Sequence, residues 1–151
     1  MKKFLLLNTA REPAVIAIAT ARKVLAETQV AERHQLSERL LARIDELSES
    51  AAIPLAEMSA LGIVSGPGPF TALRIGAAVT NALAYAHAKP IVAVTADEVP
   101  STLAFAQLVA KRCETGQTVD AMLPDYGREP TITPPKPDAK SVKPSRGSRR
   151  R

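Results

Sequence analysis

"VSGPGPFTALRIGAAVTNALAYAHAKPIVAV", residues Val64–Val94, decides the fold of this chain. An apolar strand, predicted over Ala60–Ser65, runs into a Gly-Pro-Gly-Pro turn. A helix predicted over Phe70–Ala88 follows the turn, and a second apolar strand is predicted over Pro90–Val94. A strand, a helix and a strand at this spacing indicate a right-handed crossover in which the two strands are parallel.

The rest of the pattern adds three strands and two helices to this unit. The strands are predicted at Lys3–Asn8, Ala14–Thr20 and Val24–Glu32, joined by short turns as an antiparallel meander. The third strand is the most polar of the three, which favours a place near the edge of the sheet. Helical periodicity covers Gln35–Ala52 and Asp97–Arg112. We therefore expect an α/β fold, a five-stranded mixed sheet flanked by helices.

The Gly-Pro-Gly-Pro turn is a candidate phosphate-facing site. Gly66 and Gly68 permit backbone angles that other residues avoid, and the Thr71 hydroxyl is placed to cap or line the start of the next helix. A helix N-terminus with free N–H groups attracts anions. On the residues alone, a bound anion and a plain strand-to-helix turn are equally compatible with this stretch.

The helix that follows carries two apolar stripes. One is made of small residues every four positions, Ala72, Gly76, Thr80 and Ala84. The other is larger, Ile75, Val79 and Leu83. Small side chains let a second helix approach closely, so we expect the small stripe to face outward as a partner-binding surface and the larger stripe to face the sheet. The alternative is that both stripes pack inside the lobe, as one of them must. Leu36, Leu40 and Ile44 of the first helix are expected to face the sheet or to border the same surface.

Composition and residue spacing argue against a disulfide-stabilised protein, a membrane-spanning protein and a metal-binding protein. The net charge of +5 resides in the segment 136–151, which has seven Lys or Arg and one acidic residue, whereas the rest of the chain is close to neutral. The single cysteine, Cys113, allows no internal disulfide and suits a reducing cytoplasm, and no segment is long enough to cross a membrane. His34, His87 and Cys113 lack metal-ligand spacing, so we expect no metal site.

Three regions are predicted along the chain. We expect a lobe over residues 1–113, a bridging segment over 114–135 and a basic tail over 136–151. The tail has almost no apolar residue and cannot bury enough surface to order itself alone.

The glycine turn and its helix resemble the signature G-x-G-S-F-T-G-L-R-I-G of the bacterial TsaB (YeaZ) family. SERLLARIDEL (Ser37–Leu47) is similar to the first helix of that family, FLLLNTA (Phe4–Ala10) to its opening strand, and residues 123–136 loosely to its C-terminal Y-x-R-x-P run. The resemblance implies an RNase H-like (actin-like ATPase) lobe. It also implies a non-catalytic subunit that binds the catalytic paralogue TsaD and supports threonylcarbamoyl transfer to adenosine 37 of tRNAs reading ANN codons. The chain would hold no cofactor of its own, since ATP and a metal ion are expected on partner subunits, which include a TsaE-type ATPase.

The sequence departs from the family pattern at several positions. Asn8 replaces the aspartate that organises a metal-bound phosphate in an actin-like ATPase lobe, Leu36 replaces a histidine, and Pro69 and Ala72 replace a serine and a glycine. The resemblance also implies that the second lobe is largely missing, and it leaves open a homodimer in the absence of the partner.

Two other functions stay open. One is a small phosphate-binding transferase or NTPase that uses the Gly66–Thr71 turn, although it would lack the carboxylate at position 8. The other is a nucleic-acid-binding module that acts through the basic tail, with salt-sensitive and nonspecific contacts because aromatic residues are absent there.

Overall fold

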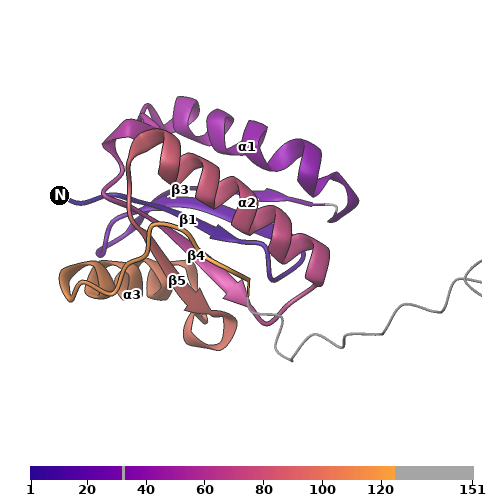
Figure 1. The fold of residues 1–151 in the computed structure, drawn as a ribbon. Coiled ribbons are helices and arrows are strands. Elements are labelled where there is room, and N and C mark those ends of the chain that lie inside the picture. The colour runs from indigo at the N-terminus through magenta and orange to yellow at the C-terminus, as the bar shows by residue number, and fades with distance from the viewer. Residues whose placement is uncertain (32, 125–151) are drawn as a thin grey trace, which may run out of the picture.

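The computed structural model describes residues 1–31 and 33–124, which form one five-stranded sheet with helices on both faces (Figure 1). The strands are β1 (Phe4–Asn8), β2 (Ala14–Ala19), β3 (Val24–Val30), β4 (Ala60–Gly66) and β5 (Ile91–Thr95). Their order in the sheet is β3-β2-β1-β4-β5. The β1–β2 and β2–β3 pairs are antiparallel, whereas β1–β4 and β4–β5 are parallel. The predicted mixed sheet, its parallel crossover and the edge position of β3 are confirmed.

Two layers of helix cover the sheet. Helices α1 (Leu36–Ala51) and α2 (Phe70–His87) lie on one face, and α3 (Thr102–Glu114) lies on the other (Figure 1). Three short 3-10 segments connect these elements, η1 (Arg33–Gln35), η2 (Leu55–Glu57) and η3 (Ala96–Glu98).

The predicted start of the last helix at Asp97 is wrong. Residues 96–98 form η3, and α3 begins only at Thr102. The Ser101 side chain caps this helix by accepting a hydrogen bond from the Ala104 N–H at 3.1 Å. Pro100 explains the delay, because a proline disfavours the helical conformation of the residue before it.

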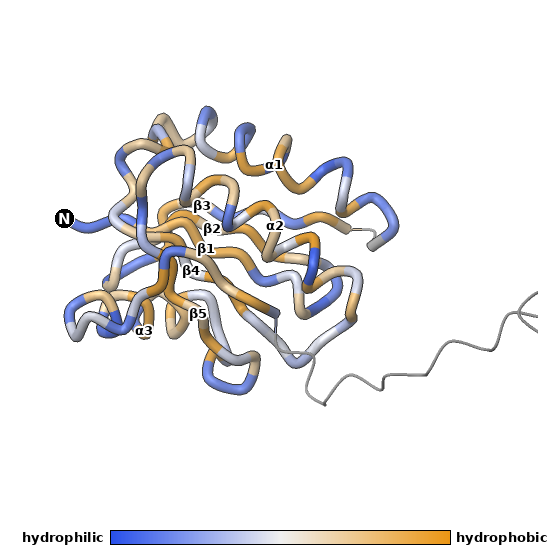
Figure 2. Tube along the Cα trace, in the orientation of Figure 1, coloured by the Kyte–Doolittle hydropathy of each residue, from blue (hydrophilic) through white to orange (hydrophobic). Residues whose placement is uncertain are grey.

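Alternation along β1 divides the core into two clusters. Leu5 and Leu7 pack under α1 and α2, whereas Phe4 and Leu6 pack under α3. Figure 2 shows the hydrophobic residues concentrated along the central strands. Since both faces are covered, β4 is buried along its whole length, as its apolar sequence predicts.

A segment after α3, Gln117–Pro124, crosses the outer edge of β5 and reaches α2. We call it the strap. Val119 and Ile91 exchange two backbone hydrogen bonds of 2.8 Å, and the Met122 side chain is only 5% exposed. The strap therefore packs on the lobe. The division of the chain at residue 113 stays a prediction, and the expectations for residues 125–151 lie outside the described residues.

No helix of the described ranges combines the length and the apolar character that crossing a membrane requires.

Candidate functional site

The glycine turn is packed against the turn that joins β1 to β2. Gly66 has a φ of +138°, a conformation that favours glycine. A Cβ added at Gly68 would lie 2.9 Å from the Cα of Ala10, so only glycine fits where the two turns meet. The space beside Gly68 is thus filled by backbone.

The polar residues expected around the turn do not converge on it. Asn8 Oδ1 accepts the N–H of Ala10 at 3.1 Å, which ties the amide to its own turn. Thr71 is exposed on the outer side of α2, where it lines a shallow depression with Arg74, Ile75 and Ala78. The N-cap of α2 is Pro69, and the first backbone bond of the helix runs from the Leu73 N–H to the Pro69 carbonyl at 2.9 Å. Anion binding by Gly66, Gly68 and Thr71 stays a prediction.

The predicted orientation of α2 is wrong. The small stripe is buried in the lobe itself, with Ala72, Gly76, Thr80 and Ala84 all facing the sheet. A Cβ at Gly76 would overlap the hydroxyl of Thr9, which follows β1, and Thr80 is 0% exposed. The small side chains allow α2 to approach its own sheet closely. They are therefore not available to a partner in this fold.

The larger stripe was expected to face the sheet and lies instead toward the flank of α2. Ile75 and Val79 are half-buried against the core, and only Leu83 is buried. In α1, by contrast, Leu36, Leu40 and Ile44 are buried in the same core cluster. Of the two positions expected for them, the one facing the sheet is correct, and these three residues offer no exposed partner surface.

The outer face of α2 is the feature that the sequence interpretation missed. It exposes seven residues, Phe70, Thr71, Arg74, Ala78, Ala82, Tyr85 and Ala86. Arg74 is the single charged side chain of the 18-residue helix, and its guanidinium lies 5.4 Å from the centre of the Phe70 ring. Tyr85 is 91% exposed. A helix of a globular protein usually has a charged outer face, whereas this one carries Arg74 as its single charge among mostly apolar residues. This shortage of charged residues in α2 was the sequence signal that could have indicated an apolar outer face.

Helix α1 borders this face with a mixed surface. Leu41 is 48% exposed, but most other outward positions of α1 are polar or charged, among them Glu38, Asp45, Glu46 and Glu49. The apolar surface on this side of the sheet is therefore centred on α2.

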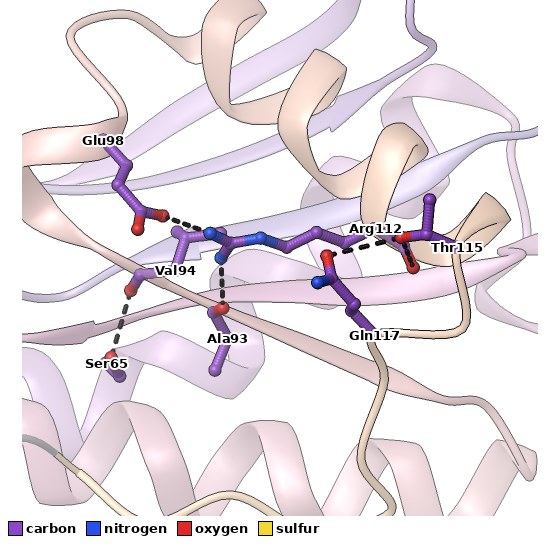
Figure 3. A network of polar contacts seen from close by, with 7 residues as sticks. All are labelled: Ser65, Ala93, Val94, Glu98, Arg112, Thr115 and Gln117. Atoms are coloured by element: carbon purple, nitrogen blue, oxygen red, sulfur yellow. Dashed lines mark hydrogen bonds and ion pairs between the residues drawn. The ribbon is translucent and has the colours of Figure 1, made fainter.

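A polar network lies at the free edge of β5, on the face of the sheet that α3 covers (Figure 3). Arg112 of α3 donates from Nη1 to the Ala93 carbonyl at 2.9 Å, and its Nη2 lies 2.9 Å from Glu98 Oε2. On the inner side of β5, Ser65 Oγ of β4 donates to the Val94 carbonyl at 3.1 Å, where the β4–β5 register shifts, and this bond joins the two strands. An unpaired strand edge invites association, so Arg112 and the strap together protect β5.

Among the described residues, the histidines, the cysteine and the carboxylates do not form a metal site or a reactive thiol site. Within residues 1–31 and 33–124, no group of three or more His, Cys, Asp or Glu is placed to hold a metal ion. Cys113 is half-buried, and this burial raises the pKa of its thiol. A raised pKa lowers the thiolate fraction at neutral pH, which makes this cysteine a poor nucleophile.

Sheet order and helix placement define an RNase H-like α/β lobe. RuvC of T. thermophilus has the same fold, with a TM-score of 0.57 over 78% of this chain and 98% of that chain at 12% identity. YeaZ from Pseudomonas aeruginosa matches at 30% identity with a TM-score of 0.55, over 63% of this chain and 44% of that chain.

The sequence then gives the family. The protein-family model described as "TsaD: tRNA N6-adenosine threonylcarbamoyltransferase" matches residues 22–107, which is more than half of the chain. The chain therefore belongs to this family.

Two curated relatives illustrate the match. The tRNA N6-adenosine threonylcarbamoyltransferase of Staphylococcus epidermidis is 41% identical over 66 residues, 44% of this chain and 19% of the relative. The tRNA threonylcarbamoyladenosine biosynthesis protein TsaB of Haemophilus influenzae is 29% identical over 91 residues, 60% of this chain and 38% of the relative. The chain thus spans less than half the length of either relative.

Proposed function

We propose that this chain is a non-catalytic subunit that binds a TsaD-type transferase. In this role it supports threonylcarbamoyl transfer to N6 of adenosine 37 in tRNAs that read ANN codons. Membership of the TsaD family supports the pathway, and the similarity to TsaB and YeaZ supports the accessory role. In this proposal ATP and a metal ion bind to the partner subunits, and a TsaE-type ATPase is one of these partners.

The outer face of α2 is the observation that carries the docking role. An exposed apolar helix face with one charge is costly in water unless another surface covers it. Ala78, Ala82 and Ala86 recur every four residues along it, so a partner helix can approach at close range. In this arrangement α2 forms the centre of an inter-subunit helix packing, with α1 at its border. The same face would pair two copies of the chain when the partner is absent.

Binding of the catalytic paralogue tests the proposal directly. The purified full chain is expected to form a stable complex with the TsaD-type protein of the same organism, measured by calorimetry and by size-exclusion chromatography. A reconstituted modification assay is expected to lose threonylcarbamoyladenosine formation when the chain is left out. Absence of both effects would contradict the accessory role.

We also expect the purified chain to hydrolyse no ATP by itself. The position of the metal-organising aspartate is Asn8, a neutral amide that already accepts a hydrogen bond from Ala10. Mg²⁺ is held through carboxylates and phosphates, so this amide is a poor substitute. Phosphate release should equal the buffer rate with and without Mg²⁺. ATP turnover that disappears in the Thr71→Ala variant would instead support an enzyme at the glycine turn.

Removal of residues 136–151 is expected to leave the melting temperature unchanged. This segment has seven Lys or Arg and almost no apolar side chain to bury. In the complex with the catalytic subunit, the same deletion should weaken tRNA binding at low salt, with a loss that shrinks as salt rises. Thermal melts and tRNA titrations at several salt concentrations measure the two effects. A large drop in melting temperature would contradict the first expectation, and equal tRNA affinity at low salt would contradict the second.

A further inference from the structure

One side chain of α2 holds the strap in place. Asn81 Nδ2 donates to the Met122 carbonyl at 3.1 Å, and the Met122 N–H donates to Asn81 Oδ1 at 2.9 Å. The amide therefore satisfies both backbone groups of Met122, much as a neighbouring strand would. The Met122 side chain enters the core cluster that also contains Leu83 and Ala84. Asn81 thus fixes the strap on the flank of α2.

The strap runs along α2 in the opposite direction to the helix. Val119 pairs with Ile91, Asp120 lines a groove with Tyr85 and Lys89, and Met122 reaches Asn81. In Figure 1 the orange end of the described chain passes from α3 across β5 toward α2.

Leu123 lies next to the outer face of α2. Its Cα follows the carbonyl that accepts from Asn81, so it is within about 6 Å of Asn81 Nδ2 by peptide geometry. On the helix surface, Asn81 is adjacent to the exposed residues Ala78 and Tyr85. Leu123 itself is 88% exposed. An exposed leucine therefore borders the apolar face of α2.

The outer face of α2 alone is smaller than a stable protein–protein interface, which suggests that a partner also contacts neighbouring elements. Stable interfaces bury about 800 Å² per partner, with about 20–30 residues on each side. Helix α2 exposes seven, and outward positions of α1 such as Glu38, Asp45 and Glu49 are charged. The strap is the neighbour that continues the apolar surface.

We infer that Asn81 is a positioning residue, which seats the strap so that Leu123 extends the docking face for the TsaD-type subunit. The inference rests on the proposed function, and it names a second element of the same docking site. The partner surface that fits it is apolar where it meets Tyr85 and Leu123.

Affinity for the purified catalytic paralogue, measured with the full chain, tests this assignment. Leu123→Ser is expected to lower the affinity about tenfold with an unchanged melting temperature, because the side chain is exposed. Asn81→Ala is expected to lower the affinity to a similar extent and to raise hydrogen exchange over residues 117–124. In the Leu123→Ser background, Asn81→Ala should cost less than about twofold, since its effect acts through Leu123. Lys111→Ser, on the exposed side of α3, is the matched control and should bind as the wild type does.

The outcomes separate this inference from the proposed function. If Leu123→Ser binds normally while Ala78→Arg blocks binding, the docking face ends at α2 and the assignment to the strap is wrong. If the costs of Asn81→Ala and Leu123→Ser are additive, Asn81 acts on stability alone and its positioning role is wrong. If the wild-type chain does not bind the paralogue at all, the proposed function and the inference both fail.

Discussion

The Thr80→Arg substitution is expected to unfold the lobe. Thr80 is 0% exposed and lies on the face of α2 that packs on the sheet. An arginine there would need several additional heavy atoms of space and would bring a charge into the core without a partner. The expected loss is more than about 5 kcal/mol, comparable to the whole stability of many small domains. Circular dichroism should show a disordered chain at 25 °C.

The matched control at this position is Thr80→Val. The Thr80 hydroxyl is buried and has no hydrogen-bond partner among the residues that the structure describes. Valine has nearly the same shape and removes the unpaired polar atom, so we expect the melting temperature to stay equal or to rise by an amount equivalent to about 1 kcal/mol. A folded Thr80→Arg protein with normal thermal stability would show that α2 packs in a different rotation.

The fold could be predicted because its signals are local. The turn residues, the change of hydrophobic period after Val30 and the length of each apolar run place nearly every element within a few residues of its observed bounds. The start of α3 is the exception, because the capping Ser101 and the preceding Pro100 outweigh the helical periodicity predicted from Asp97.

The rotation of α2 could not be predicted from its pattern. A stripe of small residues indicates close approach of another backbone, but it does not identify that backbone. Here Gly76 lies against Thr9, which follows the lobe's own first strand, and Thr80 is fully buried within the lobe. Because Arg74 is the single charged side chain of α2, the charge contrast that normally marks the outer face of a helix is weak.

The strap was missed for a different reason. Its two anchors, Val119 and Met122, lie in a segment of only eight residues that is too short to show a helical or strand period, so no periodic signal marks them. Their partners, Ile91 and Asn81, are far away in sequence. Only the tertiary fold brings them together, and single-sequence periodicity does not report such contacts.

The Ala78→Arg substitution is expected to abolish binding of the catalytic paralogue and to leave the lobe folded. Ala78 is exposed at the centre of the outer face of α2, so the isolated chain has room for the arginine side chain. Packed helices have axes about 8–10 Å apart, and a long charged side chain cannot fit between them at a position that holds alanine. The expected loss of affinity is at least about 100-fold, roughly 3 kcal/mol. Calorimetry of the complex and a thermal melt of the isolated variant measure the two effects.

A charge added elsewhere separates docking from long-range electrostatics. Gln107→Arg adds the same charge on the exposed side of α3, on the opposite face of the sheet, and should bind as the wild type does. Normal binding by Ala78→Arg would exclude the outer face of α2 from the interface, because no partner helix could then pack against it. Loss of binding in both variants would point to charge repulsion across the whole molecule. Only loss in Ala78→Arg alone places the partner on this helix, whose outer apolar residues are exposed in the described part of the chain.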